Sequence, residues 1–143
     1  MLKEIKTQIT INASSDKVWS ILTDFEKYPD WNPFILYVKG NVQEESRIEI
    51  KVKALNKKAM TFKPTVLKVT PNKELRWLGS LMVKGLFDGE HCFELNDNDN
   101  GTTTLIHSEC FKGIFGGLFN TDDTKAGFEL MNNKLKALVE KSI

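Results

Sequence analysis

The chain has 143 residues, of which 41% are hydrophobic and 27% are charged, as expected for one globular domain with a single core over residues 1–143. Its formal net charge is +1 and its basic residues are scattered, so we expect no nucleic-acid partner. No segment approaches the length of a membrane span, and the N-terminus lacks a continuous apolar stretch, which predicts a cytoplasmic protein without integral membrane association.

Cysteines and histidines are few. Cys92 and Cys110 form no CxxC pair, and the two histidines do not stand at metal-ligand spacing from them. The sequence also contains no recognisable phosphate-binding loop. We therefore expect no metal and no cofactor.

The first predicted element is a strand over residues 3–11. Ile5, Thr7, Ile9 and Ile11 lie on one face of it and polar residues lie on the other. This period of two is typical of a half-buried strand.

A helix follows the first strand. Ser14 or Ser15 can cap its N-terminus, and apolar residues come next. Pro29 and Pro33 are expected to break the helical pattern, which leaves a short second helical turn near residues 25–28.

Strand patterns then continue from Phe34 to Phe111, with turn-forming residues between them and no helix. Such spacing predicts an antiparallel meander, in which residues 95–101 form the clearest turn. The predicted strands are 35–42, 46–55, 60–71, 73–83, 86–95 and 101–111.

A long helix is predicted from residue 121 to the C-terminus. Phe128, Met131, Leu135 and Leu138 fall on one of its faces. The fold class is therefore α+β, with a curved antiparallel sheet of about seven strands around this helix and two short helices after strand one. The space between the sheet and the helix can form a cavity.

Five segments of the chain carry a resemblance, and in order they are 14–35, 74–79, 89–95, 101–113 and 127–140. Taken together, they resemble the SRPBCC superfamily (the START-like or helix-grip fold), in its branch of polyketide cyclases, dehydrases and lipid-transport proteins. The resemblance implies one START-like domain with a hydrophobic cavity under the C-terminal helix. It does not imply one reaction, because the superfamily includes cyclases, hormone receptors, lipid carriers and a co-chaperone domain.

The hairpin of residues 87–111 places polar groups on the inward face. If its turn centres on Asp99, Cys92 lies opposite Ile106 and Cys110 opposite Asp88, which argues against a disulfide and predicts two free thiols. A slip of one residue would reverse the orientation of one strand relative to the other. The predicted inward pairs are Phe93 with Leu105, His91 with His107, Gly89 with Glu109, and Phe87 with Phe111.

His91, His107 and Glu109 therefore become the candidate polar groups of the cavity. One interpretation is that they orient a polar atom of a ligand, or that His91 and Glu109 act as acid and base on an enolisable substrate. The other is structural: the histidines bond to backbone or to one another, and Glu109 reaches water at the cavity mouth.

Aromatic and aliphatic residues complete the predicted site. Trp31, Asn32 and Phe34 lie where the resemblance implies a cavity entrance, or they form a core cluster at that corner. Trp77 faces inward as a core residue or a ligand-stacking surface. The predicted ligand-binding residues are Trp31, Asn32, Phe34, Trp77, Phe87, His91, Phe93, His107, Glu109, Phe111, Phe128, Met131 and Leu135.

Two glycine-containing segments are possible covers of the cavity. Gly79 and Gly85 flank a loop that can act as a gate, although such glycines also serve simple turns. Residues 114–119 can form a lid, a lipid contact or a dimer patch, or they can be buried against the helix.

Three functions are expected from these patterns together with what the resemblance implies. The first is binding or carriage of a small hydrophobic molecule (a lipid, aromatic or polyketide-like compound) by a monomer or homodimer. The second is a cofactor-independent cyclase or dehydratase that uses His91 and Glu109. The third is a co-chaperone-like interaction module, for which the lysine-rich residues 51–58 are a candidate surface or a solvated sheet face.

Overall fold

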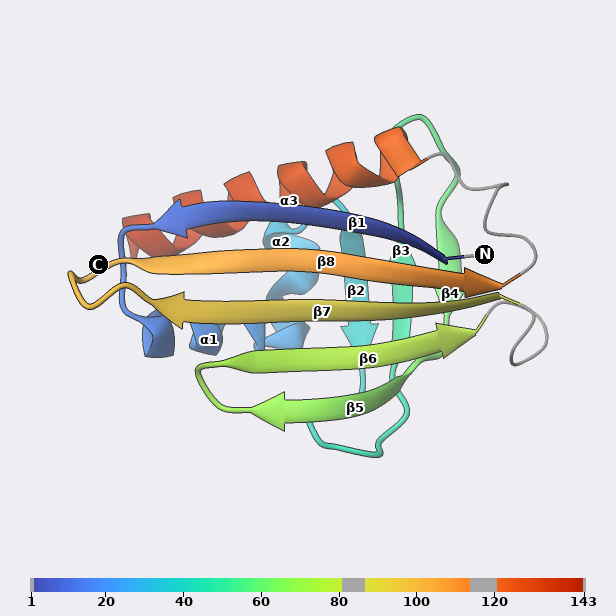
Figure 1. Ribbon diagram of the computed structural model, residues 1–143, viewed down its shortest axis with the longest axis horizontal. Helices are drawn as coiled ribbons and strands as arrows, with labels where there is room; N and C mark the ends of the chain where they lie inside the picture. Colours follow the sequence, from blue (N-terminus) through green and yellow to red (C-terminus); the bar gives the residue numbers. More distant parts are fainter. Residues whose placement is uncertain (1, 81–86, 114–120, 143) are drawn as a thin grey trace.

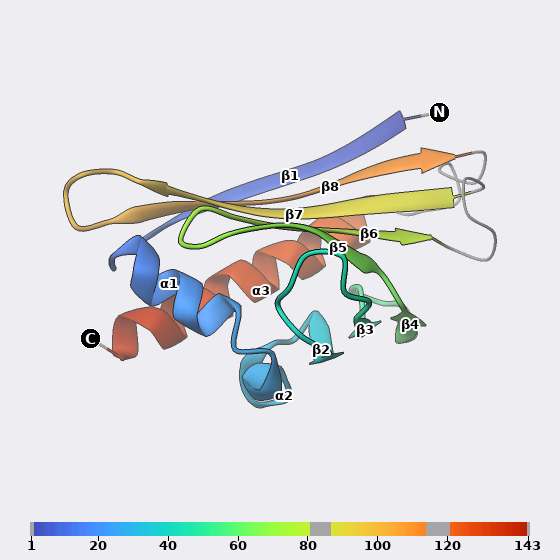
Figure 2. The same cartoon turned by 90° about the horizontal axis from the view of Figure 1, so that it is seen from below.

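A computed structural model describes residues 2–80, 87–113 and 121–142. It contains an antiparallel five-stranded sheet in the order β1-β8-β7-β6-β5. The long helix α3 and the short helix α1 lie on one face of this sheet (Figures 1 and 2). The strands are β1 (Leu2–Ile11), β5 (Thr65–Thr70), β6 (Glu74–Ser80), β7 (Phe87–Asp97) and β8 (Thr103–Gly113).

A second, three-stranded sheet lies below the same face (Figure 2). It consists of β2 (Ile35–Lys39), β3 (Glu49–Val52) and β4 (Met60–Phe62). The predicted helix-grip architecture is thus confirmed. The helices are α1 (Ser15–Leu22), the 3-10 turn η1 (Phe25–Lys27), α2 (Tyr28–Trp31) and α3 (Thr121–Lys141).

The two sheets meet at a bend at Pro64. Residues 60–71 were predicted as one strand, but β4 ends at Phe62 and β5 begins at Thr65. Proline has no N–H to give to the ladder, so a regular strand is interrupted there. Backbone contacts still link the sheets, since Ile48 N donates to Pro64 O at 2.9 Å. This interruption gives eight strands among the described residues, where about seven were expected.

Pro29 does not end the second helical region as predicted. The 3-10 turn over Phe25–Lys27 agrees with the expected helical turn, but α2 follows it directly and contains Pro29 in its first turn. At that position the missing N–H has no intrahelical partner to lose and the fixed φ suits a helix.

One face of α3 is buried against the sheet. Phe128, Met131 and Leu135 of the predicted apolar stripe are buried, but Leu138 is only half-buried and Val139 completes the buried face instead. Gly127 permits a close approach on this face, because a Cβ at this position would lie 2.5 Å from the Phe34 ring. No helix among the described residues is long and apolar enough to cross a membrane.

The register of the β7–β8 hairpin differs from the prediction by two residues. The loop runs from Asn98 to Thr102 and centres on Asn100 instead of Asp99. Asp97 Oδ1 accepts from Asp99 N at 2.8 Å, and Asn100 Oδ1 accepts from Thr102 N at 3.1 Å, so local turns fix the loop. A shift of two residues changes the partners but keeps each side chain on its predicted face. The observed pairs are Phe93 with His107, His91 with Glu109, Gly89 with Phe111, and Phe87 with Gly113.

Both cysteines are free, as predicted. Cys92 is buried and pairs with Ser108, whereas Cys110 is half-buried and pairs with Glu90. The partners differ from those predicted because of the same two-residue shift.

Candidate functional site

The inward face of β7 and β8 brings three polar side chains into contact. His91 Nδ1 lies 2.9 Å from Glu109 Oε1, and His91 Nε2 lies 2.7 Å from His107 Nε2. In the ladder Glu109 is directly opposite His91, and His107 is the next inward residue along β8. One imidazole therefore bridges the other two predicted polar residues.

Two residues from other elements extend this contact. On α3, Asn132 Oδ1 lies 2.8 Å from His107 Nδ1, and Asn132 Nδ2 donates to Thr7 Oγ1 on β1 at 2.8 Å. Thr7 Oγ1 in turn donates to the backbone oxygen of His107 at 2.8 Å. We call these five side chains (Glu109, His91, His107, Asn132 and Thr7) the buried polar network.

The hydrogen-bond directions determine where the protons lie. The Thr7 hydroxyl donates to a carbonyl, so it accepts from the Asn132 amide, whose oxygen then faces His107 Nδ1. His107 Nδ1 must carry the hydrogen, and a neutral His107 therefore has a lone pair on Nε2. His91 must then donate through Nε2. This leaves one proton to be shared between His91 Nδ1 and Glu109.

The surroundings of the histidines keep His107 neutral. Burial, followed by the proximity of His91, holds the pKa of His107 well below its usual value. The Phe128 ring stacks on His107 at 4.1 Å, and Phe93 stacks at 4.4 Å. Trp77 stacks on His91 at 5.1 Å. The inner part of the network is thus enclosed by aromatic side chains.

Glu109 is the outer end of the network. Its side chain keeps 17% of its exposure, whereas the His91 side chain keeps 5%. Gly89 on β7 makes room for it, since a Cβ there would overlap Glu109 Oε2. Among the described residues no group bonds Oε2, so this atom can accept a hydrogen bond from a bound molecule.

Trp31, Asn32 and Phe34 lie in another part of the core. Asn32 Oδ1 accepts from the backbone N–H groups of Phe34 and Ile35, at 2.9 and 2.8 Å, and so shapes the turn after α2. The Asn32 amide nitrogen and Trp31 Nε1 are buried and have no partner among the described residues. Only the Phe34 ring reaches the network, 6.4 Å from the His107 ring.

Three of the remaining predicted ligand-binding residues are buried in the core, namely Phe111, Met131 and Leu135. Phe87 pairs with Gly113 through its backbone, and its side chain lies outside the described part of the structure.

The two predicted covers lie mostly outside the described residues. Gly79 lies within β6, opposite Gly89, and does not form a turn. Gly85 and the lid segment 114–119 fall outside the described part of the chain.

The hydrogen-bonding roles of Asn132 and Thr7 were not predicted, although the sequence contains a signal for them. Each is a polar residue on an otherwise apolar face, with Thr7 between Ile5 and Ile9 and Asn132 beside Met131. A buried polar side chain needs a partner, so such positions predict a hydrogen bond across the core.

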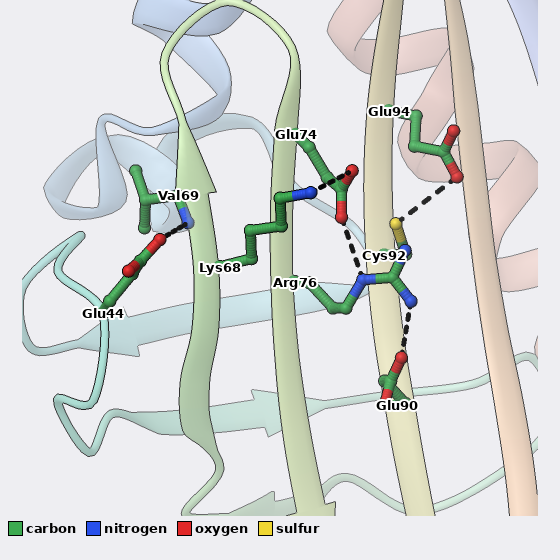
Figure 3. Close-up of polar contacts among 8 residues, drawn as sticks. All are labelled: Glu44, Lys68, Val69, Glu74, Arg76, Glu90, Cys92 and Glu94. Atoms are coloured by element: carbon green, nitrogen blue, oxygen red, sulfur yellow. Dashed lines mark hydrogen bonds and ion pairs between the residues drawn. The ribbon is translucent and has the colours of Figure 1, made fainter.

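The outward face of the main sheet carries charged side chains on β5, β6 and β7 (Figure 3). Arg76 donates through Nε to Glu74 at 3.0 Å and through Nη1 to Glu90 at 2.5 Å. Lys68 lies 3.5 Å from Glu74, and Cys92 donates to Glu94 at 3.6 Å. Burial raises the pKa of the Cys92 thiol to about 12, so it stays protonated. We call the four residues Lys68, Glu74, Arg76 and Glu90 the outer ion-pair network.

A polar groove of about 790 Å³ lies away from the predicted site. Its lining contains none of the predicted ligand-binding residues and is rich in acidic groups, which do not suit an apolar ligand. Among residues 2–80, 87–113 and 121–142, no three His, Cys, Asp or Glu side chains are grouped to hold a metal ion. The lining residues are 14–16, 72–74 and 94–97.

The fold, with α3 held against the sheet, is that of START-like proteins, and solved structures agree. Protein MLL2253 from Mesorhizobium loti has a TM-score of 0.78 at 19% identity, covering 99% of both chains. A START superfamily protein from Mycobacterium smegmatis has a TM-score of 0.73 at 19% identity, covering 98% of this chain and 99% of the other. Zhui aromatase/cyclase from a Streptomyces species has a TM-score of 0.70 at 16% identity, covering 99% and 95%.

The family is shown by a direct match. The model for the family "polyketide cyclase / dehydrase and lipid transport" matches residues 3–142. The chain therefore belongs to this family. No curated protein matches it.

Proposed function

We propose that the protein binds and carries a small, largely apolar molecule between the main sheet and α3, and that Glu109 fixes its polar end. The observation that carries this proposal is the buried polar network, which runs through an aromatic core and ends at one partly exposed carboxylate. Glu109 Oε1 contacts His91, whereas Oε2 bonds no described residue and so leaves an acceptor for the polar end of a ligand. The aromatic side chains would supply apolar contact, and Glu109 would orient a hydroxyl or N–H group.

Native mass spectrometry of freshly purified protein tests this proposal. We expect a stoichiometric bound molecule that is released on denaturation and identified by its mass. Glu109→Gln keeps the shape but removes the charge, and we expect about 10- to 100-fold weaker binding of that molecule, because hydrogen bonds to charged groups are strong. Glu90→Gln on the outward face is the matched control and should bind normally.

Two results would overturn the carrier proposal. One is an empty protein that also shows no saturable binding of 8-anilinonaphthalene-1-sulfonate, a general probe of apolar sites. The other is an equal loss of binding in the Glu109→Gln and Glu90→Gln variants, which would indicate that Glu109 has no specific contact with the ligand.

A second function, cofactor-independent cyclisation or dehydration, is favoured by the proton shared between His91 and Glu109. That contact can release a proton to a leaving hydroxyl or take one from an enolisable carbon. Glu109→Gln separates the two functions once the bound molecule is known. In an enzyme it should lower kcat by at least about 100-fold, whereas in a carrier it lowers affinity and there is no turnover to lose.

A further inference from the structure

One stretch of the chain is strongly basic. Residues 50–73 contain seven of the chain's 20 basic residues and none of its 19 acidic residues. The stretch forms β3, β4 and β5 with their connections. The basic residues are scattered over most of the chain, and this stretch is the exception.

The charge is concentrated at the turn between β3 and β4. Residues 53–60, which we call the hairpin turn, contain Lys53, Lys57 and Lys58, all exposed. Within the described residues, none of these lysines takes part in an ion pair. Lys53 Nζ donates to the backbone oxygen of Lys57 at 3.1 Å. Their charges are therefore available to a partner.

Exposed apolar side chains accompany these lysines. Leu55 is 43% exposed and Met60 is 45% exposed, and both rank among the few large hydrophobic residues on the described surface. The β3–β4 hairpin lies at the end of the molecule where α3 begins, away from α1 and the C-terminus (Figure 1). The hairpin turn thus presents lysine ammonium groups around a small apolar projection.

This combination favours a lipid surface over other anionic partners. The hairpin turn has no arginine to bind phosphate or guanine in bidentate fashion and no aromatic ring to stack on a base. Lysines attract anionic headgroups over a short range, and leucine and methionine gain free energy by entering the interface. We propose that the hairpin turn docks the protein on membranes that contain anionic phospholipids. This proposal is independent of the ligand-binding function.

Vesicle co-sedimentation tests the docking. Wild-type protein should bind vesicles of phosphatidylcholine and phosphatidylglycerol at a ratio of 3:1, should not bind pure phosphatidylcholine vesicles, and should dissociate at high salt. Each lysine near the surface contributes about a fivefold factor, so replacing Lys53, Lys57 and Lys58 with Gln should weaken binding on the order of 100-fold.

A matched variant controls for net charge. Replacing Lys27, Lys134 and Lys141 with Gln removes three exposed lysines elsewhere on the molecule, and vesicle binding should stay close to wild type. Thermal unfolding followed by circular dichroism checks that both triple variants remain folded. Equal binding by the two triple variants, or no binding by the wild type, would overturn the proposal.

Leu55→Ser distinguishes a membrane from a soluble polyanion. It should weaken vesicle binding about fivefold, since a partly buried leucine is lost from the interface, and leave binding to a single-stranded DNA oligonucleotide unchanged. If the wild type binds the oligonucleotide as tightly as the vesicles and Leu55→Ser affects neither, the hairpin turn is a polyanion site and the membrane proposal is wrong.

Discussion

The two faces of the main sheet carry polar networks that differ in their access to water. The buried polar network holds two histidines and a carboxylate on the inward face, whereas the outer ion-pair network holds four charged side chains on the outward face (Figure 3). His91 and Glu90 are adjacent in β7 and belong to opposite networks. Alternation along a strand thus places neighbouring residues in environments where the same kind of contact has different energetic consequences.

The two networks differ in what can bond a polar group after a substitution removes its partner. On the outward face, water can solvate a charge that loses its ion pair, so single contacts contribute little. On the inward face His91, His107 and Asn132 are buried, and a removed partner leaves a buried donor or acceptor without a bond. Substitutions in the two networks should therefore differ in size and in their response to pH and salt.

The largest expected effect is that of Asn132→Ala. This change removes the partner of His107 Nδ1 and the donor to Thr7, and it opens a small cavity. We expect a loss of about 2–4 kcal/mol in the free energy of unfolding, measured by urea denaturation. The neighbouring exposed Asn133→Ala should change it by less than about 0.5 kcal/mol. Similar losses in both variants would show that the network does not stabilise the fold.

An intermediate effect is expected from pH through His107. Its pKa in the folded state is lowered, so below its unfolded pKa of about 6.5 the unfolded chain binds a proton that the folded chain does not. The free energy of unfolding should therefore fall as the pH decreases below about 6.5, by up to about 1.4 kcal/mol per pH unit from this group.

His107→Phe removes this contribution. Urea denaturation of wild type and variant between pH 7.5 and pH 5 should give a shallower pH dependence for the variant, whatever its absolute stability. Parallel curves would mean that His107 also takes up a proton in the folded protein.

The smallest effect should come from Glu90→Gln in the outer ion-pair network. Arg76 keeps Glu74 as a partner, so we expect a loss of at most about 1 kcal/mol at low salt and a smaller loss in 0.5 M NaCl. Chemical denaturation at the two salt concentrations measures this. A loss of several kcal/mol, or one that salt does not reduce, would show that the outer network behaves like a buried one.

The sequence predicted the inward orientation of the site better than its contacts. Alternation placed His91, His107 and Glu109 on the same face, and that assignment is correct despite the wrong register. Register depends on the side-chain bonds within the turn from Asp97 to Thr102, and a strand pattern does not contain them. The contact between His91 and His107 was among the interpretations of the sequence, but the second side-chain partner of His107 was not predicted, for a related reason. Asn132 follows His107 by 25 residues in another element, and only the packed fold brings the two together.

Proline positions were harder to interpret than hydrophobic patterns. The sequence predicts that Pro29 breaks a helix and that Pro64 lies within a strand, yet Pro29 lies inside α2 and Pro64 separates β4 from β5. The effect of a proline depends on which backbone N–H the fold needs at that position. Whether the fold needs that N–H depends on the residues packed around the proline, which the sequence pattern does not show.

The short strand β4 has a consequence for self-association. It lies at the end of the three-stranded sheet, where exposed backbone groups invite pairing with a second copy. It has only three residues, Met60–Phe62, and Lys63 and Pro64 follow it directly. A strand this short, with a charged side chain and a proline at its end, is a poor template for edge-to-edge pairing. The bend that divides the two sheets therefore also protects the protein against aggregation through this edge.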